Sequence, residues 1–189
     1  MPDRPPQVIT LGHGSGGRLT GELVRDVFLP HLSNPRLDAL GDAAWLPRVE
    51  GRLAMTTDGF VVSPRVFPGG DIGCLAVYGT VNDLAVGGSV PLALSASFLL
   101  EEGLPIDELK GFAASMGAAA RRCGVEVVTG DTKVVERGHG DGVFVCTAGV
   151  GRLRDLPPTG VASVELSDEV VVSGRSEEHT SELQSRITI

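Results

Sequence analysis

The apolar positions of the chain repeat with two different periods, and the longer period predicts helices. Residues 18–29 carry apolar side chains at helical spacing and are followed by Pro30, which predicts an amphipathic helix. Its apolar stripe consists of Leu19, Leu23, Val27 and Leu29. Residues 105–123 predict a second, alanine-rich helix, with proline near its start and Gly124 after its end. Each of these helices has one face to bury against a core.

Short apolar runs that end at glycine predict the strands. Four runs are expected to form a four-strand core: residues 52–64, 90–103, 125–138 and 141–153. We expect the first strand to end or bend at Asp58 and Gly59, and the third to be interrupted at Gly130 and Asp131. Shorter strands are expected at residues 7–11 and 43–46. The alternation of elements predicts an α+β or α/β domain that ends near Leu153.

A third helix is predicted at residues 72–88, after a Pro-Gly-Gly turn, and it is small or apolar on two faces. One face is formed by Ile72, Ala76, Gly79, Asp83 and Val86, and the other by Gly73, Val77, Thr80 and Leu84. Such a helix is expected to be buried nearly all round. It nevertheless carries Asn82 and Asp83 within the stretch TVNDLAVGG. Because an unpaired buried charge is costly, Asp83 is expected to have a compensating partner.

Charge and cysteine content narrow the class of protein. The net charge of −8 argues against a nucleic-acid surface. The three cysteines, Cys74, Cys123 and Cys146, have no CxxC spacing, so we expect buried, reduced thiols in a cytosolic protein. No apolar run reaches the length of a membrane span, and the N-terminus shows no signal peptide. A cytoplasmic protein without nucleic-acid or membrane partners is therefore expected.

Four aspartates stand at special places in the predicted elements. Asp58 and Asp131 follow strands, Asp71 follows Gly69 and Gly70 at a helix start, and Asp83 lies inside the third helix. Singly, each has an ordinary explanation as a helix cap, a turn residue or a hydrogen-bonded side chain. Together they suggest a phosphate site, because a glycine turn at a helix start favours anions. Carboxylates near a phosphate need a hard cation between them, and Mg2+ prefers oxygen ligands.

The stretch GHGSGG at residues 12–17 matches G-x-G-x-x-G, between a predicted strand and a helix. One interpretation is a nicotinamide- or flavin-binding module. That fold requires an apolar second strand ending in an acid about 20 residues on, where this chain has the loop-like NPRLDALGD. The interpretation we favour is a glycine loop that closes over a ligand. No G-x-x-x-x-G-K-[ST] motif is present in the sequence, which excludes an ordinary P-loop.

Two basic side chains lie next to these stretches. Lys133, two residues after Asp131, could contact a phosphate, act as a base, or simply reach solvent. His13 lies in the glycine loop and is the histidine with a plausible site role. Both remain candidate catalytic residues.

Several motifs together resemble the HypE family of hydrogenase maturation factors. These motifs are HGSGGR, TTDGFVVSPRVFPGGDIGCLAVYGTVNDLAVGG, FLLEEG and VTGDTKVV, and the resemblance runs from about Ile9 to Gly174. The family belongs to the superfamily of aminoimidazole ribonucleotide synthetase, selenophosphate synthetase and thiamine-monophosphate kinase. The resemblance implies an N-terminal α/β domain of the aminoimidazole ribonucleotide synthetase-like fold. It also implies a homodimer formed through the sheet, with ATP and Mg2+ in a cleft beside the interface.

The resemblance assigns site residues by motif. The nucleotide would contact the positions Asp58, Gly69, Gly70, Asp71, Asn82, Gly130, Asp131, Thr132 and Lys133. The metal ligands would be Asp58, Asp71, Asp83 and Asp131. HypF would supply a carbamoyl group to a C-terminal cysteine, and ATP-dependent dehydration would give a thiocyanate. The cyano group would then pass to iron on the HypC–HypD complex.

We expect the chain to divide into three segments. Residues 1–153 would be the ATP-binding and dimerisation domain, and residues 154–174 a linker with the first strand of a second domain. The stretch RSEEHTSELQS resembles a translated sequencing adapter, so residues 175–189 are expected to be a non-native tail. None of the three cysteines lies on a mobile C-terminal tail, so we expect the chain to be inactive alone.

Overall fold

The computed structural model describes residues 7–155 and 160–169, in two units that meet between residues 156 and 157. The second unit contains one 3-10 turn, η3 (Val161–Ser163), among its described residues. The strand expected at residues 168–174 lies outside the described residues except for Asp168 and Glu169, and so does the whole tail at residues 175–189.

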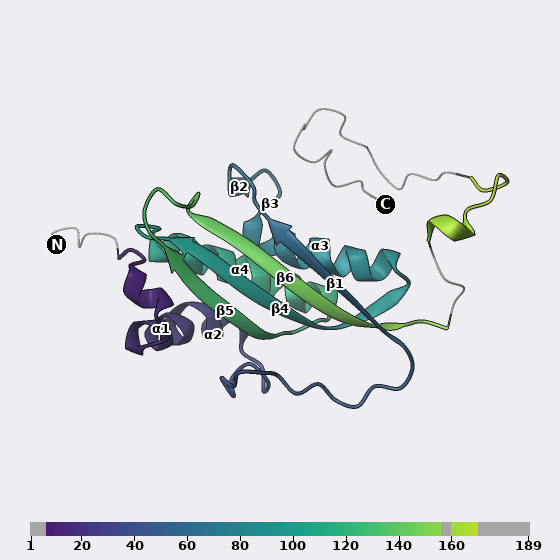
Figure 1. Ribbon diagram of the computed structural model, residues 1–189, viewed down its shortest axis with the longest axis horizontal. Helices are drawn as coiled ribbons and strands as arrows, with labels where there is room; N and C mark the ends of the chain where they lie inside the picture. The colour runs from purple at the N-terminus through teal and green to yellow at the C-terminus, as the bar shows by residue number, and fades with distance from the viewer. Residues whose placement is uncertain (1–6, 156–159, 170–189) are drawn as a thin grey trace. The chain divides into compact units, whose positions relative to one another are not determined.

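A four-stranded sheet forms the centre of the first unit (Figure 1). Its strands are β1 (Leu53–Phe60), β4 (Ser89–Glu101), β5 (Val127–Val135) and β6 (Val143–Leu153), in the order β1-β6-β4-β5. The β4–β5 pair is parallel, and the β1–β6 and β4–β6 pairs are antiparallel. A parallel pair needs a crossover, which α4 (Ile106–Cys123) supplies. The expected four-strand core of an α+β domain is confirmed.

Two expected interruptions of the strands are wrong. β1 continues through Asp58 and Gly59, where Asp58 pairs with Thr147 of β6. β5 likewise continues through Gly130 and Asp131, which stay in register with β4. Ladder hydrogen bonds on the neighbouring strand outweigh the local turn preference of a glycine beside an aspartate.

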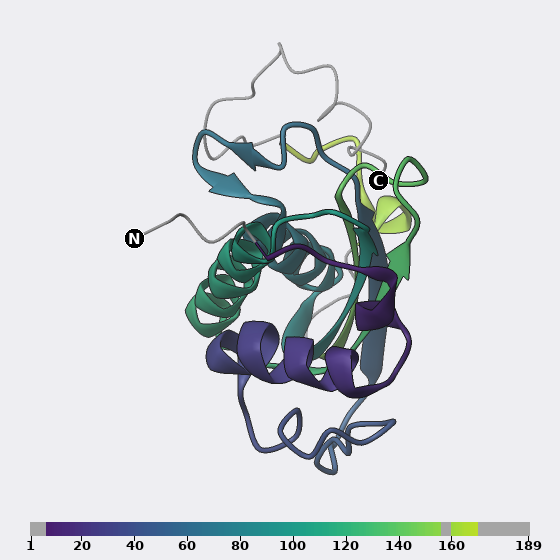
Figure 2. The ribbon, with the colours of Figure 1, turned by 90° about the vertical axis from the view of Figure 1, so that its left-hand side faces the viewer.

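The helices α3 (Ile72–Val86) and α4 cover one face of the sheet (Figure 2). The core between the two layers is almost entirely aliphatic and phenylalanine, and fully buried members include Phe60, Ile72, Leu94, Leu100, Phe112 and Val145. Gly73 lets the helices approach closely, because a Cβ there would lie 2.1 Å from the carbonyl oxygen of Phe112. Gly124 ends α4 in the left-handed conformation, as the sequence predicts.

The expectation that α3 is buried all round is wrong. Its buried residues are Ile72, Gly73, Ala76, Val77, Thr80 and Leu84, which form a single face. Asn82 and Asp83 are exposed, and Val86 is 77% exposed. The sequence misled because the outer face of α3 also carries small and apolar residues, so its polarity does not mark the solvent side.

The N-terminal segment folds beside α4 and reaches β5 (Figure 1). It consists of η1 (Leu11–Gly14), α1 (Arg18–Leu23), the π-helical turn η2 (Val24–Phe28) and α2 (Leu29–Leu32). The helix continues past Pro30, because the wide π turn accommodates a residue that lacks an N–H group. Asn34 then joins the segment to the sheet by donating to the carbonyl of Val127 at 2.9 Å.

The strand expected at residues 7–11 is reduced to an isolated bridge between Val8 and Pro105, and Leu11 already belongs to η1. The turn FPGG forms the tip of a hairpin between β2 (Val66–Phe67) and β3 (Gly70–Asp71). The strand expected at residues 43–46 is absent from the structure of the described residues. Residues 41–51 instead form a loop that makes no backbone hydrogen bond with any other described residue. Trp45, the single tryptophan, is 90% exposed there.

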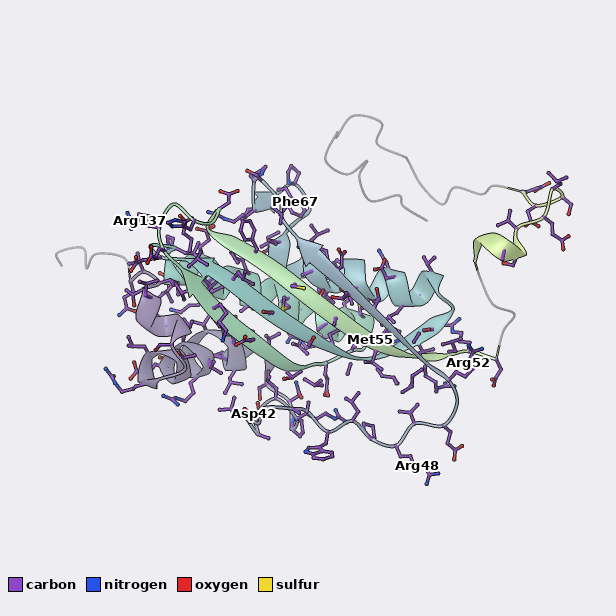
Figure 3. The ribbon with its side chains drawn as sticks, viewed as in Figure 1. Asp42, Arg48, Arg52, Met55, Phe67 and Arg137 are labelled. Carbon is purple, nitrogen blue, oxygen red and sulfur yellow. The ribbon has the colours of Figure 1, made fainter. Side chains whose placement is uncertain are left out.

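No helix among the described residues of the first unit covers the second face of the sheet (Figure 2). Met55 points outward from this open face and is 75% exposed (Figure 3), and Leu53 and Leu99 are exposed with it. Cys146 also lies on the open face and is exposed, while Cys74 and Cys123 are half-buried. The expectation of three buried thiols is therefore wrong, because alternation along β6 turns Cys146 outward. All three thiols are free.

The loop between β5 and β6 is fastened by Glu101 at the end of β4. Its carboxylate accepts hydrogen bonds from the backbone N–H of Gly138 at 2.5 Å and of Gly142 at 2.9 Å. These donors lower the pKa of Glu101 below the ordinary glutamate value.

In the described part of the chain, no helix is both long and apolar enough to cross a bilayer.

Candidate functional site

A cavity of about 440 Å³ lies between the N-terminal segment and strands β4 and β5. Its apolar walls come from α1, η2 and α2 on one side and from the sheet on the other. Its polar groups come from the glycine loop, β5 and the start of loop 41–51. The lining includes Gly16, Gly17, Thr20, Val24, Phe28, Leu37, Asp42, Phe98, Gly130, Asp131 and Thr132. The volume is in the range typical of small-molecule sites.

The glycine loop is seated directly on β5. A Cβ at Gly14 would lie 2.6 Å from the backbone nitrogen of Val134, so only glycine allows this approach. Gly16 has φ +77°, a left-handed conformation that glycine adopts without strain. His13 binds back to Thr10, whose backbone N–H donates to Nδ1 of His13 at 3.0 Å. The structure thus places His13 and the glycine loop beside the strand that carries Asp131 and Lys133.

Strand β5 presents different chemistry on its two faces. Gly130 and Thr132 point toward the helices and the cavity, whereas Asp131 and Lys133 alternate to the open face. Lys133 Nζ lies 3.2 Å from Oδ2 of Asp131, and their side chains are 62% and 58% exposed. Because β5 is an edge strand, this ion pair stands at the rim of the cavity. It is available to a ligand that extends around the edge.

Asp58 and Asp83 lie near each other, where β1 packs on α3. Oδ2 of Asp83 accepts a hydrogen bond from Thr56 Oγ1 at 3.0 Å. A Cβ at Gly79, one helical turn before Asp83, would lie 3.3 Å from Oδ2 of Asp58. Asp83 therefore has a hydroxyl partner at the surface, and the expected compensation of a buried charge is not required. Asn82 is exposed beside it.

Asp71 occupies a third location, at the opposite end of α3. It caps the helix by accepting from the backbone N–H of Cys74 at 3.0 Å and from the hydroxyl of Ser115. Gly69 lies in the hairpin turn with φ +95°, and Gly70 begins β3 just before Asp71. At about 1.5 Å per residue, Asp71 and Asp83 are separated by about 18 Å along the helix.

The four predicted metal ligands therefore occupy three separate places in one chain. Asp58 and Asp131 stand on strands at opposite edges of the sheet, about 14 Å apart at about 4.8 Å per strand. They also point to opposite faces. The residues that the structure describes contain no cluster of three or more metal-binding side chains. Of the predicted nucleotide residues, those on β5 lie together, from Gly130 to Lys133, and the glycine loop lies beside them.

The cavity also contains residues that sequence reasoning missed. Asp42 (labelled in Figure 3) borders it, and Phe28 and Phe98 form a tilted aromatic pair with ring centroids 4.9 Å apart. A signal for Asp42 was present, because Gly41 and Asp42 repeat the Gly-Asp pair of Gly130 and Asp131. No comparable signal marks the two phenylalanines, since an apolar aromatic residue usually belongs to the core.

The mixed sheet and this site define a class of protein. The profile of the family described as AIR synthase related protein, N-terminal domain, matches residues 40–153. The chain belongs to this family. Its mostly antiparallel sheet also differs from the doubly wound parallel sheet of dinucleotide-binding modules, so the alternative interpretation of residues 12–17 is wrong.

Within that family the chain is similar to HypE proteins, as its motifs predict. It is 50% identical over 171 residues to a carbamoyl dehydratase HypE of Rhizobium leguminosarum bv. viciae, covering 90% of this chain and 49% of that protein. Against the Escherichia coli K12 HypE the identity is 43% over 176 residues, covering 90% and 52%. The chain thus spans about half the length of the curated relatives it matches.

Solved structures agree with the sequence comparison. The crystal structure of a hydrogenase maturation protein HypE in complex with ATP superimposes with a TM-score of 0.74 at 54% identity. That match covers 76% of this chain and 43% of the other. A crystal structure of a HypE–HypF complex also matches, with a TM-score of 0.54 and 48% identity. The predicted fold and family resemblance are confirmed.

Proposed function

We propose that this chain is the nucleotide-binding part of an ATP-dependent carbamoyl dehydratase that matures [NiFe]-hydrogenase. The observation that carries the proposal is the cavity between the glycine loop and β5, with the Asp131–Lys133 pair at its rim. A glycine loop offers backbone N–H groups to phosphates, and Lys133 offers a positive charge. The similarity to a HypE that was crystallised with ATP supports the same ligand here.

A magnesium ion fits this arrangement as a companion of the nucleotide. Mg2+ is usually held by one or two carboxylates together with phosphate oxygens and water. Asp131 and Asp42, which border the same cavity, could supply such ligands without a larger cluster. Asp58, Asp71 and Asp83 remain proposed as metal ligands by resemblance, but within one chain they lie too far from Asp131 to share its ion.

The metal proposal is tested with Asp131→Asn. We expect the variant to lose most of the magnesium-dependent part of ATP affinity, because the amide cannot balance the charge of the ion. The measurement is titration calorimetry of the 189-residue chain with ATP, with and without Mg2+. Unchanged magnesium dependence would sink the assignment. Asp38→Asn, on an exposed side chain outside the cavity lining, is the matched control.

Lys133 and His13 are proposed as the groups nearest the chemistry. The Lys133 ammonium group lies beside Asp131, so it is proposed to stabilise charge on the transferring phosphate. In the longer protein, Lys133→Ala is expected to lower turnover far more than it lowers ATP affinity. An equal loss of affinity and turnover in the longer protein would indicate ground-state binding only. His13 is proposed to position the glycine loop through Thr10.

The remaining steps of the proposed reaction involve partner proteins and an acceptor cysteine. HypF is proposed as carbamoyl donor to a cysteine thiol other than the three in this sequence, and ATP is proposed to take the carbamoyl oxygen as phosphate, leaving a thiocyanate. The HypC–HypD complex would accept the cyano group. None of Cys74, Cys123 and Cys146 is proposed as acceptor, because all three belong to the folded first unit. Measurable ATP-dependent cyanation by the 189-residue chain would refute this point, and failure to co-purify with HypF would refute that partner.

The open face of the sheet is proposed to join two copies of the chain. It presents Leu53 and Met55 of β1 to solvent and, farther along the sheet, Leu99 of β4, and burial of these apolar side chains would stabilise a dimer. The dimer also agrees with the family resemblance, in which two sheets close into a barrel.

The Met55→Asp variant is expected to dimerise much more weakly, because formation of the dimer would bury the new carboxylate. The measurement is sedimentation equilibrium at about 50 µM, well above a micromolar dissociation constant. Val66→Asp, on the exposed hairpin strand β2, is the control and should leave the mass unchanged. A monomer for the unmodified chain would refute the proposal.

A further inference from the structure

We propose that Glu101 is a positioning residue, whose carboxylate holds the loop at residues 136–142 and, through the end of β5, the strand against which the glycine loop packs. This inference rests on the proposed ATP-binding function and adds to it a residue that is not a proposed ligand contact. Glu101 belongs to the motif FLLEEG, which has no role in the function proposed so far.

The Glu101 carboxylate joins the two ends of loop 136–142. Oε1 accepts a hydrogen bond from the backbone N–H of Gly138, and Oε2 accepts one from that of Gly142. Both glycines have positive φ, +83° and +77°, so the loop adopts this tight shape without strain. Hydrogen bonds to a charged acceptor are stronger than those between neutral groups. One side chain therefore fixes the whole loop.

The backbone around Glu101 connects this loop to the candidate site. Glu101 is the last residue of β4, where it pairs with Val135 at the end of β5. The N–H of Glu102 donates to the carbonyl of Val135 at 2.9 Å. The N–H of Gly103 donates at 2.8 Å to the carbonyl of Ile9, which lies just before the glycine loop. Three successive residues thus hold together the end of β5, the loop that follows it and the segment that leads into the glycine loop.

The end of β5 is also where the glycine loop meets the sheet. The backbone nitrogen of Val134 would lie 2.6 Å from a Cβ on Gly14, and Lys133 directly precedes Val134. Because β5 is an edge strand that pairs with β4 alone, its end frays readily once the following loop is released. Loss of the Glu101 carboxylate would therefore move the backbone on which the glycine loop rests.

A second attachment limits the damage that loss of Glu101 can cause. Nη1 of Arg65 donates to the carbonyl of Asp141 in the same loop at 2.8 Å. Nε of Arg65 also pairs with Glu108 of α4 at 2.9 Å. We therefore expect a Glu101 variant to loosen the loop and the end of β5 without unfolding the first unit.

The first test is Glu101→Gln, which keeps the size of the side chain and removes its charge. Hydrogen exchange is followed by mass spectrometry on the 189-residue chain without nucleotide, with circular dichroism as the check on folding. Peptides that cover residues 134–142 and residues 10–17 should exchange about tenfold faster. Glu102→Gln is the matched control, because that side chain accepts neither of the two glycine N–H groups, and it should leave both peptides unchanged.

Two outcomes of the exchange experiment would overturn the proposal. Unchanged exchange at residues 134–142 would refute the attachment of the loop by Glu101. Faster exchange there with unchanged exchange at residues 10–17 would refute the connection from Glu101 to the glycine loop.

The second test is a double-mutant cycle on ATP affinity, measured by titration calorimetry. Glu101→Gln alone should weaken ATP binding about threefold or more. Combined with Gly14→Ala, it should cause no further loss, because both changes disturb the same contact of the glycine loop with β5. Losses that multiply would indicate general destabilisation and would overturn the positioning role. Failure of the unmodified chain to bind ATP would overturn the proposed function, and hydrogen exchange alone would then decide whether Glu101 positions the glycine loop.

Discussion

Gly73→Ala is expected to destabilise the first unit by about 3 kcal/mol, at the upper end for an overpacked core. The new methyl group would lie 2.1 Å from the carbonyl oxygen of Phe112 and 2.5 Å from Oγ of Ser115. The contact with Phe112 is backbone, so no side-chain rotation relieves it, and α3 and α4 must separate. Urea unfolding followed by circular dichroism measures the change in the free energy of unfolding.

Gly111→Ala is the matched control for this prediction. Gly111 lies on the exposed side of α4, where nothing stands within 4 Å of the added methyl group. The replacement should raise stability by about 0.5–1 kcal/mol, because alanine has the better helix propensity. If Gly73→Ala were as stable as Gly111→Ala, the close approach of the two helices would be refuted.

Gly14→Ala is expected to lower ATP affinity by about tenfold or more, with a smaller effect on stability. A Cβ at this position would lie 2.6 Å from the nitrogen of Val134 and 3.0 Å from its Cβ. The glycine loop would have to lift from β5, and its backbone donors would move away from the phosphates. Binding of ATP is measured by titration calorimetry, and folding by thermal unfolding.

Gly17→Ala separates this effect from the general loss of a glycine. A methyl group on Gly17 meets only the Ser15 hydroxyl, at 3.6 Å, which is ordinary van der Waals contact. ATP affinity should therefore change little. Equal losses of ATP affinity in both variants would show that loop flexibility, rather than the close contact of Gly14 with β5, determines binding.

The sequence predicted the elements better than it predicted their exposure. The strands β4 and β6 and the helix α4 lie where hydrophobic period and glycine punctuation place them. The adjacent glycine and aspartate on β1 and on β5 wrongly predicted interrupted strands. Local turn preferences do not take account of the neighbouring strand that keeps each pair in register. Burial of α3 was overestimated because small residues on its outer face imitate a core pattern.

The candidate site shows the same division between local and tertiary information. Asp131, Thr132 and the glycine loop share a cavity, although Asp131 and Thr132 lie in the middle of β5 and not at the strand end that the sequence predicts. Phe28 and Phe98 come from segments 70 residues apart, and no local pattern connects them. Sequence spacing also could not show that Asp58 and Asp131 stand at opposite edges, because strand order depends on tertiary pairing.

The exposure of Trp45 has an optical consequence. A side chain that is 90% solvated in the native state already emits from a polar environment, so unfolding is expected to shift its fluorescence little. Intrinsic tryptophan emission would then be a poor monitor of unfolding for this chain. The same indole would respond readily, by a blue shift, to any molecule that covers residues 41–51. The single tryptophan thus serves as a background-free reporter of contact at the loop that begins beside Asp42.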